Sequence, residues 1–208
     1  MDEFLPLFPL NLVLFPKMLL PLHIFEDKYK EMIGECLGQS LSFGVLYSKE
    51  NEIEPIGCTA SIHQVLKSYP DGRLDIVVLG TKRFRVLYFN SEKTYLRGII
   101  EPFNDDGTTP EPGKKDLDTL ANLYQLACHM IHRGSREETF TLPSEACAFH
   151  IAQRLNLDND LKQQLLNLQS EMERVQHLIY YLSEVVMFLA NTDKAANKAG
   201  GNGNLRKT

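Results

Sequence analysis

The sequence predicts an α+β protein in which a strand-rich first half precedes a helical second half. Over residues 4–103, short apolar runs are separated by proline and glycine turns, a pattern typical of strands. Residues 104–115 are polar and carry proline and glycine, which indicates a linker. Beyond it the apolar spacing takes the 3.6-residue period of helices. We therefore predict a strand domain over 1–103, a helical domain over 116–190 and a flexible tail over 191–208.

The composition and charge favour a globular protein without a strong overall field. The 208 residues are 43% hydrophobic and 24% charged, which is enough apolar material for a sizeable core. The formal net charge of -5 gives no overall attraction for phosphate backbones. The apolar stretch over 4–25 is broken by prolines and preceded by Asp2 and Glu3, unlike a signal peptide or a membrane span. We therefore expect a cytoplasmic protein that does not associate with membranes.

The first half contains a series of short predicted strands and one helix. Turns are predicted at Pro70–Gly72 and Gly80–Lys82, and this spacing of short strands favours a small barrel or a sandwich. The helix is predicted from apolar residues at helical spacing between Phe25 and Leu37, and Gly38 is placed to end it. The predicted strands cover 7–10, 12–15, 42–47, 56–66, 73–79, 83–89 and 95–103.

The second half contains predicted helices, with two alternatives for where they break. A helical stripe runs from Leu117 to Ile131, and a further helix is predicted over 161–168. Ser170 and Glu173 fit a capping box that opens a final helix through Leu189. A single unbroken helix over 161–189 is the alternative.

The sequence carries no recognised catalytic motif, so we predict no enzyme activity and no cofactor. It contains no phosphate-binding P-loop, no serine nucleophile elbow and no H-E-x-x-H zinc motif. Cys36 lies on the buried stripe of the first helix, where a thiol is a poor nucleophile. The chain has four cysteines and no C-x-x-C pair, and buried thiols are the simplest interpretation.

One cysteine–histidine arrangement offers a weaker alternative to the prediction that no metal is bound. Cys128 with His132, and Cys147 with His150, each place a thiol and an imidazole on one helical face. Two such helices side by side would supply the four ligands of a tetrahedral zinc site. Spacings of this kind also arise by chance, so we retain buried cysteines as the prediction.

A basic cluster with aromatic neighbours bears on nucleic-acid binding. Arg83 and Arg85 alternate along a predicted strand beside Lys82, and Phe84 lies on the opposite face. Cations and stacking aromatics are what a strand that binds single-stranded nucleic acid combines. An ordinary amphipathic strand has the same pattern, and the acidic total favours that interpretation.

Several sequence blocks resemble the N-terminal domain of Lon proteases, in order over roughly residues 4–189. Lys17 stands where glycine is commoner in that family, and Lys28 where arginine is commoner. The matching blocks are Leu5–Leu10, Val13–Pro16, Leu20–Tyr29, Ile56–Cys58, Tyr69–Arg73, Gly80–Val86 and Leu161–Leu166.

The resemblance implies an N-terminal PUA-like β-barrel with one inserted helix, followed by a C-terminal α-helical bundle. In Lon proteases this region helps to recognise substrates, and the ATPase and serine–lysine protease regions follow it. The resemblance is to the stand-alone form, so it implies a non-catalytic module whose partners are unfolded or extended polypeptides, including components of a proteolysis pathway. A nucleic-acid-binding module is the alternative by analogy with PUA barrels.

For polypeptide binding, the sequence points to apolar residues beside the first helix. We predict that Met18, Leu19 and Leu20, with Lys28 and Tyr29 of the helix, expose apolar area to an extended chain. The oligomeric state and the identity of the client do not follow from the sequence.

Overall fold

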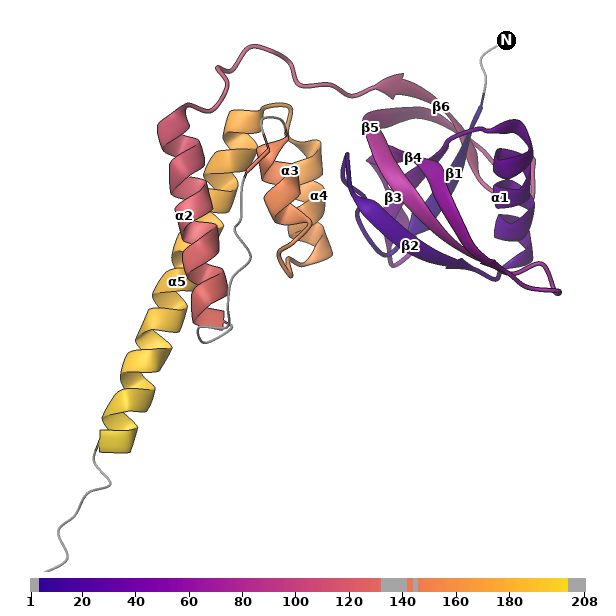
Figure 1. Cartoon of the computed structure of the whole chain (residues 1–208). Helices are drawn as coiled ribbons and strands as arrows, with labels where there is room; N and C mark the ends of the chain where they lie inside the picture. Colours follow the sequence, from indigo (N-terminus) through magenta and orange to yellow (C-terminus); the bar gives the residue numbers. More distant parts are fainter. Residues whose placement is uncertain (1–3, 132–141, 144–145, 202–208) are drawn as a thin grey trace, which may run out of the picture. The chain divides into compact units, whose positions relative to one another are not determined.

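The computed structural model describes residues 4–131, 142–143 and 146–201, and the chain forms two compact units (Figure 1). The first unit comprises Met1–Gly107 with Ala152–Gln169, and the second comprises Thr108–Ile151 with Ser170–Thr208. In chain order the elements are β1 (Leu5–Leu10), β2 (Leu19–Ile24), α1 (Asp27–Gln39), β3 (Phe43–Lys49), β4 (Glu52–Ser68), β5 (Leu74–Asn90), β6 (Arg97–Pro102), α2 (Lys114–Ile131), α3 (Cys147–Ala152), α4 (Asn159–Asn167) and α5 (Glu171–Gly201).

The strands of the first unit form one mixed sheet in the order β2-β5-β4-β3-β1-β6. β1 and β3 are parallel, and the other paired strands are antiparallel. The long β5 pairs with β2 over its first half, with β6 over its second half, and with β4 from Leu74 to Arg85. The predicted α+β class is therefore confirmed.

The predicted PUA-like barrel of short strands is not confirmed in that form: the six-stranded sheet is built on two 17-residue strands, β4 and β5. Because β5 pairs with both β4 and β6, the strands β5, β4, β3, β1 and β6 pair in a closed circuit, and β2 pairs only with β5 among the described residues. The turn predicted at Gly80–Lys82 does not form, and β5 continues through it. A Cβ atom on Gly80 would lie 2.1 Å from the carbonyl oxygen of Phe15. Glycine at this position therefore lets the backbone of β5 approach the backbone at Phe15 closely, rather than forming a turn.

Helix α1 packs on the sheet through the apolar stripe that its sequence predicts. Met32, Ile33 and Cys36 are fully buried within the larger core cluster of the unit. The helix passes Gly38 and ends at Gln39, because Ser40 adopts the left-handed conformation with φ of 55°. A second, smaller cluster surrounds Phe84.

Helix α4 belongs to the same compact unit as the sheet, although its residues lie in the range predicted as the helical domain. Asp158 caps the helix by accepting a hydrogen bond from the Leu161 amide at 2.7 Å. Asp160 accepts one from the Tyr47 hydroxyl at 2.7 Å, and Gln163 Nε2 donates to the Ile56 carbonyl at 2.9 Å. These bonds join the helix to β3 and β4, and they could not be predicted from local spacing.

In the second unit, α2 and α5 lie side by side (Figure 1). Ser170 precedes α5 and its hydroxyl accepts from the Glu173 amide at 3.3 Å, which confirms the predicted cap and the break before α5. The helical bundle predicted as one domain over 116–190 is not confirmed in that form. α5 extends to Gly201, so the range predicted as a flexible tail begins inside a helix. Within the described residues, no helix is long and apolar enough to cross a membrane.

Candidate polypeptide-binding surface

A tight turn sets the position of β2 at the margin of the sheet. Pro16 and Lys17 occupy its centre, and the Met18 amide donates to the Phe15 carbonyl at 3.2 Å. Lys17 has φ of 65°, the left-handed conformation that glycine favours at this position of a type II turn. The Lys17 amide donates to the Gly80 carbonyl at 2.8 Å, and the Gly80 amide donates to the Met18 carbonyl at 2.9 Å. The turn therefore fixes β2 against the middle of β5.

The predicted binding residues of β2 alternate between packed and exposed positions. Met18 and Leu20 are partly buried against the larger core cluster. Leu19 lies between them and 53% of its surface is exposed. The alternation follows from the strand geometry, because successive side chains point to opposite faces of the sheet. Leu19 therefore exposes apolar surface to solvent, while Met18 and Leu20 expose only part of their side chains.

The predicted helical residues form a small aromatic and cationic surface at the start of α1. The Tyr29 ring packs against Phe8 with 4.1 Å between the centroids, and Tyr29 is partly buried against the same core cluster as Met18 and Leu20. Lys28 Nζ lies 4.6 Å from the centroid of the Tyr29 ring and 3.1 Å from Glu26. The bond to Glu26 raises the pKa of Lys28 above its usual value. The lysine is thus a permanent cation over an aromatic face.

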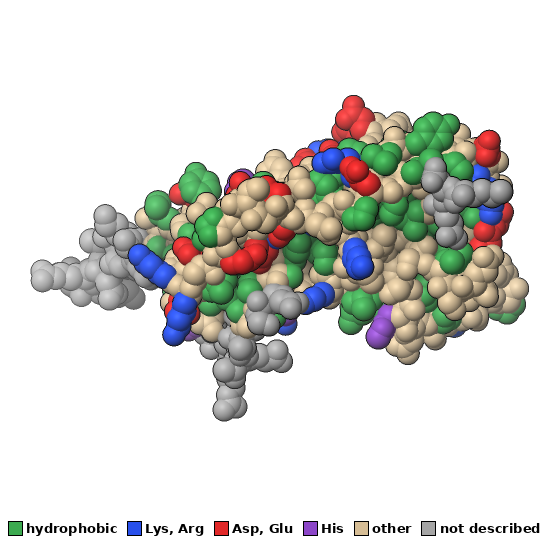
Figure 2. Space-filling view, turned by 90° about the horizontal axis from the view of Figure 1, so that it is seen from above, with side chains coloured by type: hydrophobic (Ala, Val, Ile, Leu, Met, Phe, Trp, Pro, Cys, Tyr) green, Lys and Arg blue, Asp and Glu red, His purple; other side chains and the backbone are tan. Residues whose placement is uncertain are grey.

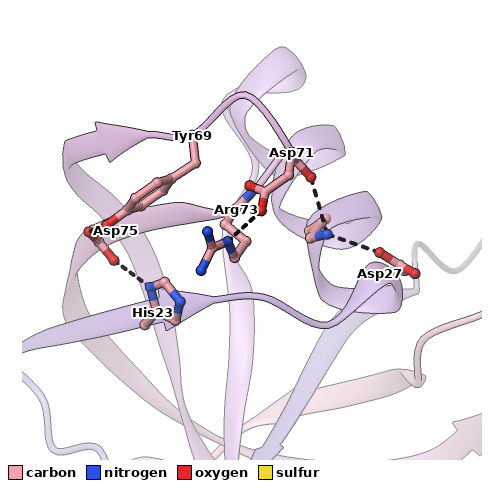
Figure 3. A network of polar contacts seen from close by, with 7 residues as sticks. His23, Asp27, Tyr69, Asp71, Arg73 and Asp75 are labelled. Atoms are coloured by element: carbon pink, nitrogen blue, oxygen red, sulfur yellow. Dashed lines mark hydrogen bonds and ion pairs between the residues drawn. The ribbon is translucent and has the colours of Figure 1, made fainter.

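A polar cluster on β2 was not predicted from the sequence (Figure 3). His23 Nδ1 lies 2.6 Å from Asp75 Oδ1, and the Tyr69 hydroxyl donates to Asp75 Oδ2 at 2.8 Å. These bonds to His23 and Tyr69 lower the pKa of Asp75. Phe25, which is 58% exposed, stacks on the His23 ring with centroids 5.9 Å apart. The cluster unites residues 52 positions apart, so only the sheet register reveals it.

Of the basic cluster considered for nucleic-acid binding, Arg83 and Phe84 are buried, whereas Lys82 is exposed and Arg85 is half-buried and paired with Glu101. Arg83 is 7% exposed and Phe84 is 1% exposed. Arg83 donates to the carbonyls of Leu166 and Leu168 and forms an ion pair with Asp105. The Arg83 guanidinium therefore caps the C-terminal end of α4, where the last carbonyls have no hydrogen-bond partner within the helix. Figure 2 shows basic and acidic side chains interspersed on the displayed face rather than gathered by sign.

The cysteines show no assembled metal or nucleophilic site within the described residues. Burial raises the pKa of the Cys36 thiol to about 11 and that of Cys58 to about 12, so both are protonated. No group of three or more His, Cys, Asp or Glu side chains is arranged to hold a metal among the residues that the structure describes. Cys147 donates to the Pro143 carbonyl at 2.8 Å, and His132 of the zinc alternative lies outside the described residues. The zinc alternative thus remains untested.

The architecture is that of an α+β domain of the Lon N-terminal type. The fold is similar to the crystal structure of a Lon N-terminal domain protein from Xanthomonas campestris, with a TM-score of 0.65 and 24% identity, over 86% of this chain and 98% of that chain. It is also similar to the N-terminal domain of a Mycobacterium avium complex Lon protease, with a TM-score of 0.63 and 21% identity, over 87% of this chain and 98% of that one.

The family follows from the sequence as well. The chain belongs to the family of the ATP-dependent protease La (LON) substrate-binding domain, whose model matches residues 4–184. A Lon protease of Dictyoglomus thermophilum is 26% identical over 209 residues, covering 94% of this chain and 26% of the relative. A Lon protease of Flavobacterium johnsoniae is 27% identical, covering 86% of this chain and 24% of the relative. The chain therefore spans about a quarter of the length of these relatives.

Proposed function

We propose that this chain binds unfolded or extended polypeptides through the surface formed by β2 and the start of α1, without catalysing their hydrolysis. The observation that carries the proposal is Leu19, which is 53% exposed on a strand at the end of the sheet order. Met18, Leu20 and Tyr29 are included as partly buried apolar residues of the same two elements and the turn before β2. Membership of a substrate-binding family supports a polypeptide ligand. We include in the proposal that the clients belong to a proteolysis pathway, that the protein acts in the cytoplasm, and that purified protein neither hydrolyses ATP nor cleaves peptides.

Apolar contact on this surface predicts weak binding with little dependence on salt. Ordering an extended chain costs about 1–2 kcal/mol per residue, so only a few anchored side chains give a net gain. We expect dissociation constants on the order of micromolar, about -8 kcal/mol. Burial of apolar area is insensitive to salt, whereas binding to RNA weakens steeply as salt is added.

The test is a titration of the protein with a reduced, unfolded polypeptide and with a single-stranded RNA, each at low and high salt. The matched variants are Leu19→Ser and Leu87→Ser. Leu87 is 59% exposed but lies near the C-terminal end of β5, away from the half of β5 that pairs with β2. Full burial of a leucine stabilises by about 1.5–3 kcal/mol, so covering the exposed half of Leu19 contributes roughly 1 kcal/mol, or about fivefold in affinity.

We expect Leu19→Ser to weaken polypeptide binding about fivefold and Leu87→Ser to leave it unchanged. Equal effects of the two substitutions would contradict this location of the surface. Binding of the RNA alone, removed by salt, would replace the proposal with the nucleic-acid alternative. ATP or peptide turnover that a point substitution in this chain abolishes would contradict the non-catalytic assignment.

A further inference from the structure

The outer edge of β2 is a regular strand edge with no paired strand among the described residues. β2 pairs with β5 through six consecutive residues, from Leu19 opposite Leu79 to Ile24 opposite Leu74, without a register shift. No other strand pairs with it, and it lies at one end of the sheet order. A strand in this position presents one row of backbone groups that the sheet does not use.

The register identifies which backbone groups face outward. The Gly80 amide donates to the Met18 carbonyl, so Met18 faces β5, and every second residue after it does the same. The backbone groups of Leu19, Pro21 and His23 therefore point away from β5. The presence of proline at position 21 supports this assignment independently. Proline has no backbone N–H, so an edge strand tolerates it only where the N–H would point to solvent. The edge thus offers two donors, from Leu19 and His23, and three acceptors.

A second open margin in the same sheet lacks this regularity. The part of β4 from Ser61 to Ser68 pairs only with β5, and its register shifts between Ile62 and Gln64 and again between Val65 and Lys67. Such bulges, together with a lysine, prevent an edge from accepting another strand. β2 has no register shift against β5 and no lysine, and Pro21 is its one feature of the kind that limits strand addition.

The side chains along β2 define the chemistry of a partner strand. On the face of Leu19 lie the exposed Phe25 and His23, whose partner is Asp75. On the opposite face Leu20 and Leu22 are partly buried against the core. The edge therefore combines unused backbone groups with apolar side chains on both faces and with no unpaired charge. An extended apolar polypeptide matches both features.

We propose that an extended apolar polypeptide segment adds to the sheet as a strand along the outer edge of β2, pairing its backbone with Leu19, Pro21 and His23. This inference rests on the proposed function and specifies how the polypeptide is held. Backbone pairing explains how one surface accepts many sequences, since every residue except proline offers the same two groups. The missing donor at Pro21 keeps the contact short and reversible.

The first test compares two peptides with identical side chains. One alternates valine and threonine between terminal lysines, and the other is the same peptide with its interior amides N-methylated. Methylation removes the donors that face the carbonyls of Leu19, Pro21 and His23, so we expect the affinity to fall about tenfold or more. Equal affinity of the two peptides would overturn strand addition while leaving polypeptide binding intact. If the unmethylated peptide did not bind at all, the proposed function would fail with it.

The second test adds a donor to the protein. Pro21→Val supplies an outward N–H without removing a bond within the sheet, so we expect the affinity for the unmethylated peptide to rise about two- to tenfold. Pro55→Val, an exposed proline of β4, is the matched control and should not change the affinity. An unchanged affinity of Pro21→Val would overturn the proposal. Concentration-dependent pairing of the protein with itself through this edge, in place of peptide binding, would also overturn it.

Discussion

Two strands of the same sheet differ in how far they are covered. In β5, Arg83 and Phe84 are both buried, and Arg83 binds Asp105 and a carbonyl at the end of α4. In β2, Leu19 is 53% exposed beside an edge with no paired strand among the described residues. An alternating pattern therefore indicates a strand but does not say how many sides of it are covered. The position of the strand in the sheet determines whether it stabilises the fold or is free to bind.

The largest expected change in the free energy of unfolding follows from removing the buried charge of Arg83 in β5. Arg83→Met keeps the length of the side chain but leaves Asp105 and the carbonyls of Leu166 and Leu168 without it. Removing one partner of a fully buried ion pair destabilises by about 3–5 kcal/mol, and the loss here should be smaller because Asp105 is 34% exposed. Denaturant unfolding of Arg83→Met and of Arg85→Met measures the difference, since the Arg85–Glu101 pair is largely exposed and contributes less than about 1 kcal/mol. Similar losses in both variants would contradict the structural role of Arg83.

The close approach between β5 and the turn before β2 predicts the next largest effect. Gly80→Ala places a Cβ atom 2.1 Å from the Phe15 carbonyl, and relief of such overpacking costs about 1–3 kcal/mol. In α1, a Cβ atom on Gly34 would meet no neighbouring segment within 4 Å, so Gly34→Ala should stabilise by about 0.5–1 kcal/mol. Thermal unfolding of both variants checks the opposite signs. An unchanged stability of Gly80→Ala would show that the two segments are not held together.

The turn that leads into β2 carries a smaller strain. Lys17 has a left-handed backbone, and replacing it with glycine relieves a cost of about 1 kcal/mol, part of which glycine returns as unfolded-chain entropy. We expect Lys17→Gly to raise the free energy of unfolding by about 0.5 kcal/mol, and Lys17→Ala, which keeps the strain, not to raise it. Denaturant melts of the two variants decide between them, and stabilisation by alanine alone would refute the argument from strain.

The smallest expected effect concerns acid. Hydrogen bonds from His23 and Tyr69 lower the pKa of Asp75 in the folded protein. The contribution of Asp75 to the free energy of unfolding is therefore fully present above its unfolded-state pKa of about 3.9, and it is lost as the pH falls through the folded-state pKa. The stability difference between the protein and Asp75→Asn should therefore shrink as the pH falls below about 5 and through the folded pKa of Asp75. A difference that grows on acidification would contradict the sign.

Local patterns in the sequence predicted the elements better than their partners. The stripe of α1, the cap at Ser170 and the α+β order were correct because each depends on neighbouring residues. The turn at Gly80 was wrong because glycine there serves the close approach of Phe15, a contact between distant segments. For the same reason, the sequence did not predict that α4 contacts β3 and β4 or that His23 pairs with Asp75. Leu19 was predicted as a binding residue, but the open edge beside it required the register.

Residue-resolved amide hydrogen exchange tests whether β2 holds an extended polypeptide at its outer edge. The protein is measured alone and with a saturating amount of a reduced, unfolded polypeptide. We expect the amides of Leu19 and His23 to become protected on binding, while those of Leu20 and Leu22, which already pair with β5, change little. Binding that leaves the Leu19 and His23 amides unprotected, or that protects the open margin of β4 instead, would contradict this expectation.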